Sequence, residues 1–95
     1  MRLSRNELEA IREKLQKLFP DGRGFLFGSR TDDNRQGEDI DILVLTSQTA
    51  PDRLRRIVLL ELEDRLGEQR IYLLVTPHQP EQPFVRQILP NCVPL

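Results

Sequence analysis

Apolar residues recur along this chain with changing periods, which predict the order helix, strand, strand, helix, strand. Near the N-terminus the period is three or four, as in an amphipathic helix with one buried stripe: Leu8, Ile11, Leu15 and Leu18. Ser4 and Glu7 have the spacing of a capping box at the start of this helix. The turn formers Pro20-Asp21-Gly22 are expected to end it.

Three short apolar runs predict strands, at residues 24–27, 40–46 and 71–75. The first run is continuously apolar, which is typical of a strand with both faces covered. Before the third, Pro51 suits the first position of a second helix and Gly67 suits the residue just past its end. Helices packed on a small sheet make this an α/β fold. The helical crossover permits parallel pairing of the strands on either side of it.

The chain is long enough for one domain with one modest core, at 95 residues. We divide it into a body, residues 1–76, and a proline-rich tail, residues 77–95. Five of the seven prolines lie in the tail, which argues against regular structure there. Residues 84–89 are the exception, with one or two helical turns that would dock on the body or on another chain. The only histidine, His78, lies among these prolines and is expected to be exposed.

Composition narrows the class of protein. Hydrophobic residues make up 38% and charged residues 31%, which fits a soluble globular domain. Fourteen basic and fifteen acidic residues give a net charge of −1, so there is no general attraction to nucleic acid or membranes. No apolar run is long enough to span a bilayer, and the N-terminus lacks the apolar region of a signal peptide. With Cys92 as the single cysteine, we expect a cytoplasmic protein.

The polar chemistry concentrates between the first two strands. The first strand stops at Gly28-Ser29, where a glycine lets backbone N–H groups approach a phosphate beside a hydroxyl donor. The second strand opens with Asp39 and Asp41, which project to the same side because strand side chains alternate. Two carboxylates held so close raise each other's pKa unless a cation lies between them, and Mg²⁺ prefers such oxygen ligands. The simpler alternative is that these aspartates only begin a strand.

Gly28-Ser29 followed by Asp39-Ile40-Asp41 resembles the signature of the polymerase-β-type nucleotidyltransferases. The order of elements also matches, from about Leu3 to Thr76. Within that superfamily the short chain is most similar to the minimal nucleotidyltransferases of prokaryotes, which are often paired with HEPN-domain proteins as antitoxin and toxin. The resemblance implies a polymerase-β-like nucleotidyltransferase fold, a small mixed sheet with helices packed on it.

The resemblance also implies roles for individual residues. Asp39 and Asp41 would be Mg²⁺ ligands, with two ions in a fully active site, while Gly28 N–H and Ser29 Oγ would hold the β- and γ-phosphates of ATP. Such a site moves AMP to a hydroxyl acceptor, mainly by positioning and electrostatic stabilisation. Arg30 has two candidate partners, the triphosphate or the acidic residues of the next loop. We favour the phosphate because Arg30 adjoins the Gly-Ser pair; for Arg35 we favour the acidic partners.

One departure from the family limits this interpretation. The strand expected to carry a third carboxylate has no acidic residue, and alignment places Tyr72 at that position, or Leu73 if the register shifts. A phenol stays protonated at neutral pH and is a poorer Mg²⁺ ligand than a carboxylate. Three functions therefore remain open: an active transferase, a catalytically weakened nucleotide-binding or antitoxin subunit that masks a partner, and a plain interaction domain.

The predicted second helix carries four consecutive apolar residues, so apolar groups extend more than halfway round it: Ile57, Val58, Leu59 and Leu60. Packing within the core is one explanation. The other is contact with a protein partner of the HEPN type or with a second copy of the chain.

Overall fold

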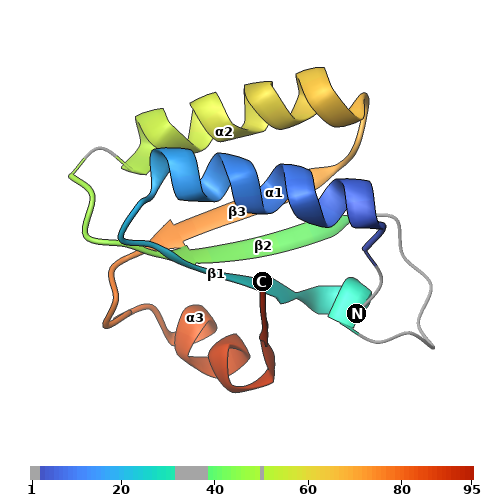
Figure 1. The fold of residues 1–95 in the computed structure, drawn as a ribbon. Coiled ribbons are helices and arrows are strands. Elements are labelled where there is room, and N and C mark those ends of the chain that lie inside the picture. Colours follow the sequence, from blue (N-terminus) through green and yellow to red (C-terminus); the bar gives the residue numbers. More distant parts are fainter. Residues whose placement is uncertain (1–2, 32–38, 50) are drawn as a thin grey trace.

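The computed structural model describes residues 3–31, 39–49 and 51–95 (Figure 1). The predicted order of helix, strand, strand, helix and strand is confirmed, and further elements follow in the tail. In chain order the elements are α1 (Arg5–Leu18), β1 (Arg23–Phe27), the 3-10 turn η1 (Gly28–Thr31), β2 (Ile40–Leu45), α2 (Pro51–Leu66), β3 (Ile71–Thr76), α3 (Pro83–Ile88), the 3-10 turn η2 (Leu89–Asn91) and β4 (Val93–Pro94).

The strands form one mixed sheet in the order β3-β2-β1-β4. β2 and β3 are parallel, as the helical crossover through α2 permits, while β1 is antiparallel to both of its neighbours. The register places Asp41 of β2 opposite Phe27 of β1 on one side and Tyr72 of β3 on the other. This α/β architecture is consistent with the nucleotidyltransferase fold expected from the sequence.

Helices cover both faces of the sheet, which explains why the strands read as continuous apolar runs. α1 and α2 lie on one face and α3 lies on the other (Figure 1). Alternate strand residues therefore enter two different clusters. The α1/α2 side holds the larger one: Ala10, Ile11, Leu15, Phe19, Leu26, Ile40, Ile42, Val44, Val58, Leu62 and Leu73. The α3 side holds the smaller one: Phe25, Phe27, Leu43, Leu45 and Val85.

The helix boundaries follow the predicted signals. At the start of α1, Ser4 Oγ accepts a hydrogen bond from Glu7 N, and Glu7 Oε1 accepts one from Ser4 N, at 3.1 and 2.8 Å. This is the predicted capping box. α2 begins at Pro51, and Gly67 follows its end with φ +80°.

The apolar run of α2 is mostly used inside the chain. Val58 is fully buried, Ile57 and Leu59 are partly buried, and Leu60 is 67% exposed. α2 packs against α1 and β3. Of the four residues, Leu60 is therefore the one that presents most of its side chain to solvent.

The helical turns expected within the tail are present as α3, but the rest of the tail, which was expected to be irregular, also contains regular structure in η2 and β4. Pro83 occupies the start of α3, where a helix needs no N–H donor. Pro94 lies in β4, an edge strand with one hydrogen-bonded neighbour. Both positions tolerate the missing backbone donor.

The tail also completes the sheet. β4 pairs with β1 through Val93 and Pro94, and Leu95 N donates to Gly24 O at 2.9 Å. Val85 of α3 is fully buried against the sheet. None of the described helices is both long enough and apolar enough to cross a membrane.

A polar cluster joins three segments at the edge of the sheet where β2 and β3 end. The carboxylate of Asp21 accepts hydrogen bonds from Thr46 Oγ1 and Ser47 N, both at 2.7 Å, and from Ser47 Oγ. His78 is exposed, as expected, but its Nε2 lies 3.3 Å from Asp21 Oδ2. The hydrogen bonds from Ser47 and Thr46 hold the pKa of Asp21 well below its usual range. The sequence pattern indicated only a helix end at Asp21.

Because its folded-state pKa is lowered, ionised Asp21 stabilises the fold above the unfolded carboxyl pKa of about 4, and this contribution is lost as the pH falls further. We expect Asp21→Asn to lower the melting temperature at pH 7. Between about pH 4 and pH 2 the melting temperature of the variant should fall less than that of the wild type. Asp64→Asn, an exposed change on α2, is the matched control. Circular dichroism melts across this range measure both, and identical pH profiles for the two variants would contradict the assignment.

Candidate functional site

Gly28 and Asp41 are in direct contact at the end of β1. Gly28 has φ +76°, a left-handed conformation that residues with a side chain rarely adopt. A Cβ atom added there would lie 2.2 Å from Asp41 Oδ2. The carboxylate of Asp41 therefore occupies the space that a side chain at position 28 would need. Both backbone conformation and available space require glycine here.

The two aspartates lie close enough to influence each other. Asp39 is exposed just before β2, and Asp41, the second residue of that strand, is half-buried. Burial, and after it the negative charge of Asp39, raises the pKa of Asp41. This is the electrostatic relationship expected for two carboxylates on one side of a strand. A bound cation would favour the ionised form and offset this effect.

Tyr72 lies on the same face of the sheet as Asp41, because residues paired laterally in a sheet point the same way. Its ring makes an edge contact with Phe27, with centroids 6.3 Å apart and an interplanar angle of 82°. Leu73 is 2% exposed and packs in the α1/α2 core on the opposite face. Of the two positions considered for the third carboxylate, the one occupied by Tyr72 faces Asp41.

Ser29 and Arg30 lie in η1, immediately after Gly28. The side chain of Ser29 lies outside what the structure describes, as do the loop residues Asp32, Asp33 and Arg35. Arg30 Nη1 lies 3.7 Å from Glu7 Oε1, and both side chains are largely buried. Arg30 thus contacts the N-terminal turn of α1, a contact that the sequence did not suggest. Its role as a phosphate ligand stays a prediction.

Asp39 and Asp41 are the carboxylates that a metal ion would use. Within the described residues there is no group of three or more His, Cys, Asp or Glu side chains placed to hold a metal. Mg²⁺ in nucleotide sites is commonly bound by one or two carboxylates, with phosphates and water supplying the other oxygens. The half-buried Asp41 beside exposed Asp39 fits one such ion arriving with a nucleotide.

A pocket of about 500 Å³ adjoins this site on the α3 side of the sheet. Its walls come from β1 and η1 on one side and from α3 and η2 on the other: Phe27, Gly28, Thr31, Phe84, Gln87, Ile88 and Asn91. Sequence reasoning missed this pocket because its two walls are far apart along the chain. The only sequence signal was the short helical segment expected within the tail.

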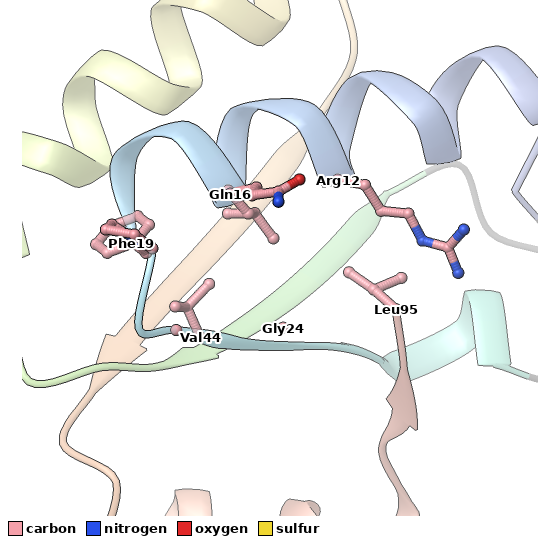
Figure 2. A pocket seen from close by; sticks show the side chains of 9 residues that line it. Arg12, Gln16, Phe19, Gly24, Val44 and Leu95 are labelled. Carbon is pink, nitrogen blue, oxygen red and sulfur yellow. The ribbon is translucent and has the colours of Figure 1, made fainter.

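Two of the other recesses differ in their relation to the site. One, of about 330 Å³, lies on the β3 side of Asp41 and is lined by Asp39, Gln69, Arg70, Ile71 and Tyr72. The other, of about 340 Å³, lies between α1 and the sheet. Figure 2 shows the walls of this second recess. One wall is formed by α1 and the residue that follows it, with Arg12, Gln16 and Phe19; the facing wall contains Val44, Gly24 and Leu95. This recess contains none of the predicted site residues.

The sequence of the chain matches the model of a known protein family. A family model described as "Nucleotidyltransferase domain" matches residues 8–95, which include Gly28, Asp39, Asp41 and the whole tail. No curated protein matches the chain.

The contact between Gly28 and Asp41 can be measured with a double-mutant cycle. We expect Gly28→Ala to destabilise the fold by about 1–3 kcal/mol, because alanine is strained in the left-handed conformation of this position and its Cβ would clash with the carboxylate. Asp41→Ala should relieve the clash, giving a coupling of about 0.5 kcal/mol or more. Denaturant unfolding measures each variant.

The matched control is Gly67→Ala. Gly67 has φ +80° but nothing within 4 Å of an added Cβ, so it incurs the conformational cost alone. Equal destabilisation by Gly28→Ala and Gly67→Ala, with no coupling to Asp41, would contradict the close contact.

Proposed function

The chain belongs to the nucleotidyltransferase-domain family, and on that premise we propose that it binds Mg²⁺-ATP at Gly28 and Asp41 and transfers AMP to a hydroxyl acceptor. The observation that carries the proposal is the contact between the Asp41 carboxylate and the Gly28 backbone. It brings together the Gly-Ser and Asp-x-Asp parts of the sequence signature, where the central strand β1 ends and β2 begins.

Each group has a defined task in this proposal. Gly28, without a side chain, lets phosphate oxygens approach the backbone after β1. Asp39 and Asp41 hold Mg²⁺ and orient the triphosphate that it binds. When bound, the ion neutralises negative charge on the triphosphate and on the departing pyrophosphate.

The reaction is a phosphoryl-group substitution. The acceptor oxygen forms a bond to the α-phosphorus, the bond from that phosphorus to the β-phosphate oxygen breaks, and pyrophosphate leaves. The acceptor proton passes to solvent. The residues of this chain contribute by holding the reacting groups in line, which supplies much of the acceleration in such sites.

Tyr72 favours a second candidate function, a nucleotide-binding subunit with weakened catalysis that acts as an antitoxin. The position facing Asp41 from β3 carries a phenol, which binds Mg²⁺ poorly compared with a carboxylate. Loss of that ligand weakens activation of the acceptor more than binding of the nucleotide. In either case we propose a HEPN-type protein as the partner, with exposed Leu60 on α2 as one contact point.

The two functions are separated by incubating the protein with α-labelled ATP, Mg²⁺ and a candidate HEPN-domain protein. We expect label transfer that falls at least about 100-fold in the double variant Asp39→Ala/Asp41→Ala, because both carboxylate ligands are lost. The matched control is Asp52→Ala/Asp64→Ala, which removes two exposed aspartates of α2.

Each outcome points to one function. Transfer lost only in the Asp39/Asp41 variant supports the transferase. Absence of transfer, with Mg²⁺-ATP binding that requires Asp39 and Asp41, supports the nucleotide-binding antitoxin. A wild-type chain that neither transfers label nor binds Mg²⁺-ATP would refute both and leave a plain interaction domain.

Tyr72→Asp tests the position of the absent third carboxylate. Because Tyr72 faces Asp41, the added carboxylate should tighten Mg²⁺ binding by about tenfold or more. Tyr72→Phe, which keeps the ring and adds no charge, should leave Mg²⁺ affinity unchanged. Isothermal titration with Mg²⁺ measures both, and unaltered affinity in Tyr72→Asp would show that this side chain does not reach the site.

A further inference from the structure

Three aromatic rings line the site face of the sheet beside Asp41. Phe27 is at the centre, with edge contacts to Tyr72 at 6.3 Å and to Phe84 at 6.4 Å between ring centroids. Phe27 is nearly buried, whereas Phe84 is 51% exposed. A half-exposed aromatic ring at the wall of a pocket is a surface on which a flat ligand can pack.

The pocket next to these rings has the size and composition of a small-molecule site. Its volume of about 500 Å³ lies within the usual range for ligand pockets. Phe27, Phe84 and Ile88 form its apolar walls, and Gln87 and Asn91 add two side-chain amides. Within the described part of the chain, neither amide makes a hydrogen bond to the protein. Both are therefore available to a ligand.

The lining indicates which part of a ligand would occupy the pocket. No charged residue lines it, so it suits a neutral flat ring better than a phosphate. Gly28 belongs both to this pocket and to the contact with Asp41. A single ligand can therefore place phosphates beside Gly28 and a ring in the pocket against Phe84. A nucleotide has this division into a charged end and a neutral ring.

We propose that this pocket binds the base of the nucleotide, and that the tail helix α3 with η2 selects which base is accepted. The inference rests on the proposed function, because it assumes phosphates at Gly28. Phe84 would pack on the base, and the amides of Gln87 and Asn91 would bind its edge. An amide presents a donor and an acceptor side by side, which matches the paired acceptor and donor on the edge of a base. Because a purine offers a larger ring to Phe84 than a pyrimidine does, we expect a preference for ATP over CTP and UTP.

A second recess leaves a separate approach for the acceptor. The recess containing Asp39 and Tyr72 lies on the β3 side of Asp41, whereas the base pocket lies on the β1 side. A base in one and an acceptor in the other would reach Asp41 from opposite directions across the sheet. This separation is why we assign the α3 pocket to the nucleotide base instead of to a ring of the acceptor.

The test compares the affinity of the full chain for Mg²⁺-ATP with its affinity for Mg²⁺-tripolyphosphate, which has the phosphates but no base. We expect Phe84→Ala to weaken ATP binding about tenfold, because base–aromatic stacking is lost, and to leave tripolyphosphate binding unchanged. Phe84→Trp should restore ATP binding. Gln87→Ala should weaken ATP binding and leave tripolyphosphate binding unchanged. The matched control is Arg86→Ala, an exposed residue of α3 that does not line the pocket.

The outcomes distinguish this inference from the proposed function. ATP binding that Phe84→Ala leaves unchanged, or a wild-type chain that binds ATP no better than tripolyphosphate, overturns the base pocket while the phosphate site stands. A wild-type chain that binds neither ligand overturns the proposed function and the inference with it. Because Phe84 is half-exposed, the Phe84→Ala variant should fold. If it weakens the binding of ATP and of tripolyphosphate equally, it has a folding defect. Phe84→Leu, which keeps apolar bulk without an aromatic ring, then decides by the same comparison of affinities.

Discussion

The contact between the Asp41 carboxylate and the Gly28 backbone is the constraint on which the site depends. It requires a glycine with a left-handed backbone conformation just after β1 and an acidic side chain at the start of β2. Antiparallel pairing of these two strands brings the residues together, with Phe27 opposite Asp41 in the register. Any side chain at position 28 would displace the carboxylate. The chemistry of the site therefore rests on local backbone geometry.

The two faces of the sheet have different tasks. The face covered by α1 and α2 buries the larger apolar cluster and supplies most of the stabilising burial. The other face is covered only in part by α3, which leaves Asp41, Tyr72 and Phe84 accessible. Strand alternation places Asp41 and Tyr72 on this partly open side. A continuous apolar strand thus carries one acid without disturbing the main core.

The site face combines two carboxylates with a row of aromatic rings. Tyr72 faces Asp41 where the resembled family has an acid, and its ring contacts Phe27. Phe84 extends this row toward the tail. Such a surface binds flat, neutral groups more readily than additional metal ions. It therefore fits the proposal of a chain that binds a nucleotide with weakened catalysis.

The sequence alone determined the local features of this protein. The capping box at Ser4, the limits of α2 at Pro51 and Gly67, and the order of the first two helices and three strands depend on neighbouring residues, so periodicity and end signals predicted them. Strand alternation also predicted a shared side for Asp39 and Asp41; in the structure Asp39 lies just before β2, and burial together with the charge of Asp39 raises the pKa of Asp41. The Gly-Ser and Asp-x-Asp pairs also indicated a nucleotidyltransferase, which the family model confirms at that level.

Only the tertiary structure decided what depends on contacts between distant segments. Pairing of β4 with β1, the pocket between Phe27 and Phe84, and the contacts of Arg30 with Glu7 and of Asp21 with Ser47 join residues far apart in the chain. Local patterns carry no information about such pairs, because the free energy that selects them comes from packing and hydrogen bonding after the chain has folded back on itself.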